Sequence, residues 1–306
     1  MTDFGLYVRM ETNWDSILKN ALLAEEHNFK SAWINDHLIG LQKGDEEMLE
    51  AWTIMTAIAA KTKKLKVGHT VLCNNFRNPA LLAKMVTTLD VISKGRVELA
   101  IGAGWYEKEY LAYGYPFLSA GERVKQLKEA LIIINKMFKE EEFDFEGEFW
   151  QLKGCRNDPK PFQKEVPIWV GGDKRKIMRV AAELATGINL PYSTFEDAKK
   201  ILGWVAEDCD TFGRKFDDFK KSYFTVMHLT KTEEEAYDIA KRAADEKKTP
   251  EEILEQRFLG TPEFLLEKIT RFRDELDMSY FMVAVRGTET IEEPITLFSD
   301  EIMKGL

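Results

Sequence analysis

Two neighbouring residues at the end of an apolar segment are suited to proton transfer. Residues 31–34 read Ser-Ala-Trp-Ile, and Asp36 and His37 follow shortly after them. The ordinary pKa of histidine, about 6.5, lets it take up or release a proton near neutral pH. Asp36 could orient the imidazole or bond a cofactor, and a purely structural role is equally open. The pair predicts a catalytic site in which His37 carries the proton and Asp36 assists.

A second group of candidates lies in residues 95–117, which read GRVELAIGAGWYEKEYLAYGYPF. Apolar residues alternate with others over 96–101, as a strand requires. Small residues follow, so a ligand could approach the main chain closely there. The third glycine of the dinucleotide fingerprint is missing, which excludes that motif. The segment predicts a cofactor site at a strand end, or else a glycine turn over packed aromatics; its candidates are Gly102, Ala103, Gly104 and Trp105.

Two further strand ends carry polar or small residues. Gly171 and Gly172 follow the apolar segment 166–170 and precede a predicted helix, so their backbone N–H groups could bind a phosphate. An ordinary strand-to-helix turn is the alternative. Asn74 follows the apolar segment 65–73 and could bond the carbonyl groups of a cofactor ring, or cap the helix that begins at Pro79.

The elements that would position these residues alternate regularly. Eight apolar strands are separated by helices, and this alternation is typical of parallel strands joined by crossover helices. Eight repeats predict a (β/α)8 TIM barrel, with a doubly wound open sheet as the runner-up. We expect one domain over residues 1–306, with an insertion loop at about 140–165 after strand 4 and a helical insertion at about 231–259 after strand 7. A barrel brings its strand ends to one pocket, which would add these rim residues: Arg9, Glu11, Tyr192, His228 and Arg286.

The composition excludes several classes of protein. The chain has 306 residues, a net charge of -9 and no lysine-rich patch, so nucleic acid is not an expected partner. Its three cysteines are far apart, and its four histidines are too scattered for a metal motif. No apolar run reaches about 18 residues, so no membrane span is expected. These features predict a reduced, cytoplasmic protein without a disulfide framework or a signal peptide.

The sequence resembles the luciferase-like monooxygenase superfamily, and most closely its coenzyme F420-dependent oxidoreductases. The resemblance follows the family's order along nearly the whole chain, in segments 33–37, 76–79, 82–84, 89–96, 102–105, 113–114, 167–172 and 261–263. It implies a barrel of the bacterial luciferase-like type, a two-electron redox cofactor and a homodimer. It also implies a non-proline cis peptide behind the cofactor ring, at residues expected to line that cofactor: Val71, Leu72 and Cys73.

The resemblance suggests what the protein does. We expect an oxidoreductase that passes a hydride between the deazaflavin F420 and a small organic substrate. An FMN-dependent monooxygenase and a non-catalytic flavin-binding barrel are the alternatives. Sugar-phosphate dehydrogenases of the group carry an acid where this chain has Trp105, and a tryptophan within the segment matching 38–41, which here reads Leu-Ile-Gly-Leu. This departure favours a less polar substrate.

Overall fold

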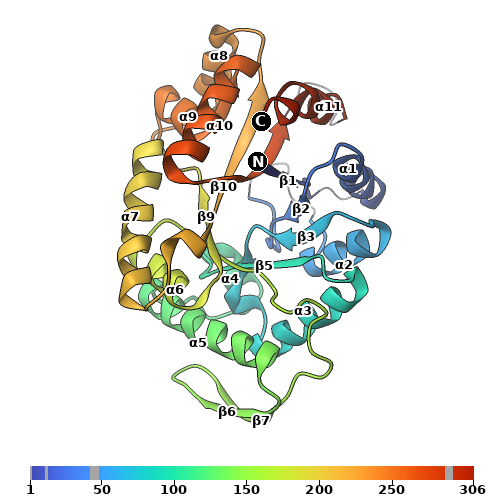
Figure 1. Cartoon of the computed structure of the whole chain (residues 1–306), viewed down its shortest axis with the longest axis vertical. Coiled ribbons are helices and arrows are strands. Elements are labelled where there is room, and N and C mark those ends of the chain that lie inside the picture. Colours follow the sequence, from blue (N-terminus) through green and yellow to red (C-terminus); the bar gives the residue numbers. More distant parts are fainter. Residues whose placement is uncertain (1, 11–12, 42–47, 287–291) are drawn as a thin grey trace.

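The strands close into a parallel barrel. In the computed structural model, which describes residues 2–10, 13–41, 48–286 and 292–306, eight strands form a ring that the pairing of β9 with β10 completes. Figure 1 shows helices arranged around the outside of this ring. The barrel, and not an open sheet, is therefore confirmed. Its strands are β1 (Asp3–Tyr7), β2 (Ser31–Ile34), β3 (Lys66–His69), β5 (Val97–Gly102), β8 (Ile168–Gly171), β9 (Gly187–Pro191), β10 (Lys220–Leu229) and β12 (Tyr280–Arg286).

Large side chains fill the amino-terminal part of the barrel interior. Trp33, Trp169 and Tyr280 pack together there and are almost fully buried. Gly5 and Gly68 make room for the indole of Trp33, because a Cβ on either would come within 2.5 Å of it. This packing closes one end of the barrel, so a ligand can enter only from the carboxyl ends of the strands.

The helices begin where the sequence provides caps. Asn78 caps the helix that starts at Pro79, and Ser119 forms a reciprocal capping box with Glu122. None of the helices among the described residues is long and apolar enough to cross a bilayer. The helices are α1 (Trp14–Glu26), α2 (Ala51–Lys61), α3 (Pro79–Ser93), α4 (Glu107–Ala112), α5 (Ala120–Lys139), α6 (Arg175–Leu184), α7 (Phe195–Thr211), α8 (Glu233–Ala243), α9 (Pro250–Gln256), α10 (Pro262–Leu276) and α11 (Glu292–Glu301).

Both expected insertions are present. The first contains the hairpin β6 (Phe143–Glu146) and β7 (Gln151–Cys155), which lies at one end of the molecule in Figure 1. The second contains α8, α9 and a strand that the sequence reasoning missed, β11 (Phe258–Gly260), which pairs with β10. Three residues are too few to show strand periodicity, so only the pairing with β10 reveals β11.

The third strand differs from its prediction. The segment 65–73 is divided into β3 and the two-residue strand β4 (Leu72–Cys73), and a non-proline cis peptide lies between them. We expected this peptide among residues 71–73, but it joins Thr70 to Val71, one bond earlier. Val71 therefore takes part in the cis peptide, as expected. The bond itself lies on the amino-terminal side of Val71, one residue earlier than predicted.

Candidate active site

One large cavity opens at the carboxyl ends of the barrel strands. Its volume is about 1180 Å³, above the range of about 300–1,000 Å³ typical of small-molecule sites, so it has room for a cofactor together with a substrate. Twelve residues were predicted for the site, and all but Asn74 line this cavity: Asp36, His37, Val71, Leu72, Cys73, Gly102, Ala103, Gly104, Trp105, Gly171 and Gly172.

Asn74 lies behind the cavity wall. Its side chain is 1% exposed, it does not line the cavity, and its amide nitrogen has no hydrogen-bond partner among the described residues. A turn of 3-10 helix begins at this residue and carries the chain away from the cavity towards α3. The helix cap at Pro79 comes instead from Asn78. Asn74 therefore lies outside the cavity lining, and its contact with a cofactor ring stays a prediction.

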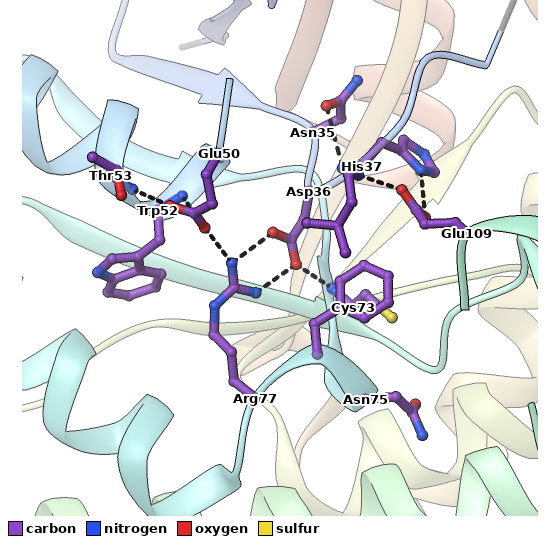
Figure 2. Close-up of polar contacts among 12 residues, drawn as sticks. Asn35, Asp36, His37, Glu50, Trp52, Thr53, Cys73, Asn75, Arg77 and Glu109 are labelled. Atoms are coloured by element: carbon purple, nitrogen blue, oxygen red, sulfur yellow. Dashed lines mark hydrogen bonds and ion pairs between the residues drawn. The ribbon is translucent and has the colours of Figure 1, made fainter. Parts of the chain in front are cut away.

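His37 is held by a buried acid from another part of the chain. Its Nδ1 lies 3.1 Å from Oε2 of Glu109 in α4, whose carboxyl group is 2% exposed. Figure 2 shows the Glu109 carboxyl group facing the imidazole. The backbone N–H groups of Leu38 and Ile39 donate to the other carboxylate oxygen, which fixes its orientation. A carboxylate can only accept, so Nδ1 carries the proton and Nε2 is the nitrogen available for proton transfer.

Asp36 does not orient His37. Its carboxylate accepts two hydrogen bonds from the guanidinium of Arg77, at 2.7 and 2.8 Å, and one from the backbone N–H of Cys73. Arg77 also binds Glu50 at the start of α2, as Figure 2 shows. Burial alone would raise the pKa of Glu50, but hydrogen bonds from residues 52–53 and from Arg77 lower it to about 2. Asp36 therefore ties the end of β2 to β4 and to α3 beneath the cavity floor.

The glycines of the cavity make room for protein side chains. A Cβ on Gly102 or Gly171 would come within 2.9 or 2.6 Å of the side chain of Val71. Gly104 has a φ of +75°, and a Cβ there would meet the hydroxyl of Tyr110. The turn at 102–104, where a ligand was expected to approach the main chain, is therefore filled from behind by Val71 and Tyr110, which form a firm floor.

The start of α6 offers backbone donors at one end of the cavity. The first bond within the helix runs from the N–H of Met178 to the carbonyl of Lys174, at 3.1 Å. The three N–H groups before it, at residues 175–177, have no backbone partner among the described residues, and all three residues line the cavity. The N–H of Gly172, which we expected to bind a phosphate, is already used: it donates to the carbonyl of Asn189 at 3.3 Å. The backbone N–H groups without a backbone partner thus lie three to five residues after Gly172, and the position of a phosphate stays a prediction.

The thiol of Cys73 and the metal-ligating residue types give no further chemistry here. The Sγ atom of Cys73 lies 2.9 Å from the hydroxyl of Tyr110, and burial raises the pKa of this thiol to about 12. The thiol therefore stays protonated and is a poor nucleophile. In the described ranges of the chain, no group of histidine, cysteine and acidic side chains could hold a metal ion.

Comparison with known proteins agrees with this architecture. The sequence model of a family described as luciferase-like monooxygenase matches residues 2–265. The chain belongs to this family. An F420-dependent glucose-6-phosphate dehydrogenase from Microbacterium testaceum is 27% identical over 321 residues, covering 95% of this chain and 93% of the relative. An FMNH(2)-dependent dimethylsulfone monooxygenase from Pseudomonas putida is 28% identical over 242 residues, covering 78% of this chain and 62% of the relative.

Solved structures of F420-dependent enzymes share the whole fold. An F420-dependent secondary alcohol dehydrogenase in complex with an F420–acetone adduct superimposes with a TM-score of 0.88 and 21% identity, covering 100% of this chain and 99% of the other. The F420-dependent tetrahydromethanopterin reductase from Methanopyrus kandleri gives 0.83 and 19%, covering 99% of both chains. At these sequence identities the comparison establishes the fold alone, and the chemistry depends on the residues of the site.

In this luciferase-like barrel the cavity also extends to the carboxyl ends of β10 and β12. The rim candidates Arg9, Tyr192, His228 and Arg286 all line the cavity, whereas Glu11 lies outside the described residues. Three residues were not among the predicted site residues: Glu109, Arg77 and Arg257. Arg77 lies in segment 76–79, which carries part of the family resemblance, but no local pattern assigns a role to any of the three, because each reaches the site through a long-range contact or through the second insertion.

Proposed function

We propose that this protein is an F420-dependent oxidoreductase that transfers a hydride between the deazaflavin and a small organic substrate. The observation that carries the proposal is the hydrogen bond from His37 to buried Glu109 at the cavity wall. An imidazole whose Nδ1 is held by a carboxylate, with Nε2 available, is the arrangement that a proton carrier needs. Hydride transfer to or from an alcohol or carbonyl must be accompanied by the transfer of a proton, which His37 would handle.

The residues that line the cavity fit a deazaflavin with a phosphate-bearing side chain. The three unused N–H groups at the start of α6 suit the phosphate, and the 10-residue helix directs its positive end at the same place. Lys176 has no ion-pair partner among the described residues, so its charge is available to an anion. The floor formed by Val71, Gly102 and Gly171 is firm and offers a surface for a flat ring.

Each part of the chain has a defined role in the proposed reaction. The bound cofactor supplies the two-electron chemistry. In the direction of oxidation, Nε2 of His37 takes the proton from the substrate hydroxyl, and the Glu109 carboxylate stabilises the imidazolium that results. In the direction of reduction, the same nitrogen returns a proton to the substrate oxygen. Asp36 and Arg77 contribute indirectly, because they hold the end of β2 from which His37 projects.

Relatives support F420, with FMN as the alternative. Both F420-dependent dehydrogenases and an FMNH(2)-dependent monooxygenase occur among the similar sequences. The same α6 donors would accept the phosphate of FMN, so an FMN-dependent monooxygenase is the second candidate. We also propose a homodimer, on the family resemblance alone; analytical ultracentrifugation of the purified protein tests it, and a monomer at working concentration would refute it.

Fluorescence titration of the purified protein with each cofactor tests the proposal. We expect F420 to bind at least tenfold more tightly than FMN, and His37→Ala to leave that affinity nearly unchanged, because His37 lies away from the α6 donors. Tighter binding of FMN would favour the monooxygenase alternative. Binding of F420 without any turnover of alcohols or carbonyl compounds would instead favour a non-catalytic flavin-binding barrel.

A further inference from the structure

Beside β10 and β12 the cavity combines an aromatic wall with two arginines whose side chains have no partner among the described residues. Tyr7 and Tyr192 both stack edge-on against Phe224, with ring centroids 5.5 and 5.4 Å apart. The hydroxyl of Tyr7 accepts a hydrogen bond of 2.8 Å from Asn35, two residues before His37. This aromatic wall therefore adjoins the wall that carries the proton carrier, where a substrate would lie.

Arg257 and Arg286 reach this place from different elements. Arg286 ends β12, in register with His228 of β10, and Arg257 directly precedes β11, which pairs with the same part of β10. Burial raises the pKa of Tyr192, and the charges of Arg257 and Arg286 oppose that rise; all three residues line the cavity. The second insertion thus places a cation beside one from the barrel.

Among the residues that the structure describes, no acid is paired with either of these two arginines. In the described part of the chain, neither Arg257 nor Arg286 forms a side-chain hydrogen bond or an ion pair, although both line the cavity. The three acids that line the cavity are already bonded elsewhere: Asp36 to Arg77, Glu109 to His37 and Asp173 to Lys174. Burial lowers the pKa of His228, so this residue does not add a charge near neutral pH.

From these observations, and resting on the proposed function, we infer that the substrate is a small organic anion: a planar or apolar body against Tyr7, Phe224 and Tyr192, with its acidic group bound by Arg257 and Arg286. Two half-buried guanidinium groups without acid partners are costly unless a ligand compensates them. A net charge of -9 for the whole chain would repel an anion from most of the surface, so this local cluster is the attracting feature. The inference revises the less polar substrate that Trp105 and residues 38–41 favour.

Binding of matched aromatic probes tests the inference without turnover. Isothermal titration would compare benzoate and phenyl phosphate with neutral benzamide, using protein loaded with whichever cofactor binds, or the free protein if neither does. We expect both anions to bind at least tenfold more tightly than benzamide. The tighter of the two identifies the acidic group as carboxylate or phosphate, and either result supports the inference. Because no reaction is measured, failure of hydride transfer leaves this readout intact.

Substitution of the arginines gives the second arm. Hydrogen bonds to charged groups change affinity by roughly tenfold to a hundredfold, so Arg257→Gln and Arg286→Gln should each weaken benzoate by that factor and leave benzamide unchanged. Arg286→Lys keeps the positive charge, so it should keep most of the affinity for benzoate. It is measured in place of Arg286→Gln if that variant does not fold. The matched control is Lys241→Gln, which removes an exposed cation of the same insertion that does not line the cavity.

Three outcomes would overturn the inference. The first is equal affinity of benzoate and benzamide for the unsubstituted protein. The second is an equal loss of both probes in Arg257→Gln, which would indicate a collapsed pocket instead of a lost charge. The third is no binding of any probe up to tens of millimolar.

Discussion

The substitution Glu109→Gln should change which nitrogen of His37 carries the proton. The Oε1 atom of a glutamine can still accept from the N–H groups of Leu38 and Ile39, which bind that oxygen in the present structure. Its amide nitrogen would then lie where Oε2 lies now, 3.1 Å from Nδ1 of His37. An amide nitrogen can only donate, so the imidazole proton should move to Nε2.

The cost in turnover follows from the loss of the base. A correctly placed general base contributes about 10²–10⁴-fold, which corresponds to roughly 2.7–5.4 kcal/mol of the activation barrier. We expect Glu109→Gln to lower kcat by a factor in this range and to leave cofactor affinity nearly unchanged. His37→Ala should lower kcat by a similar factor. The double variant should be no slower than His37→Ala, because Glu109 acts through His37.

Long-range proton–nitrogen NMR on protein labelled in its histidines reads the tautomer directly and needs no substrate. The His37 signals, assigned with His37→Ala, should show the proton at Nδ1 in the unsubstituted protein and at Nε2 in Glu109→Gln. Glu107→Gln is the matched control, since Glu107 lies on the same helix but is exposed. An unchanged tautomer in Glu109→Gln, or additive losses of kcat in the double variant, would refute the role given to Glu109.

Three further predictions concern the cofactor turn, acid stability and the buried ion pair. Gly172→Asp should weaken cofactor binding more than the isosteric Gly172→Asn in fluorescence titrations, since both add bulk at a φ of +151° but only aspartate adds a charge near the phosphate; equal losses would contradict the assigned phosphate position. Burial lowers the pKa of His69 to about 3, so the unfolded chain binds a proton below about pH 6.5 that the folded chain does not. The free energy of unfolding, measured with urea, should therefore fall by roughly 1.4 kcal/mol per pH unit below that point, and His69→Asn should flatten the slope; an equal slope in the variant would exclude His69 as the cause. Arg77→Met should cost about 3–5 kcal/mol of stability because it leaves Asp36 buried and unpaired, and adding Asp36→Asn should recover part of this loss; no recovery would mean that the cost lies in packing.

The sequence by itself determined the barrel and most of its elements. Strand alternation, helix caps such as Asn78 before Pro79, and the two insertions are local features, and local features are visible in a linear pattern. The barrel rule then brought eleven of the twelve predicted site residues to one cavity, because parallel strands that close into a ring present their carboxyl ends together.

The tertiary structure alone decided which of these residues work together. Glu109 is 72 positions from His37, and Arg77 is 41 from Asp36, so neither pairing leaves a trace in local periodicity. The purpose of Gly102 and Gly171 was likewise hidden, because it depends on where Val71 projects between two strands. Arg257 reaches the cavity only because the three-residue strand β11 pairs with β10. Side-chain partnership depends on distances across the closed barrel, and the order of residues along a chain does not contain those distances.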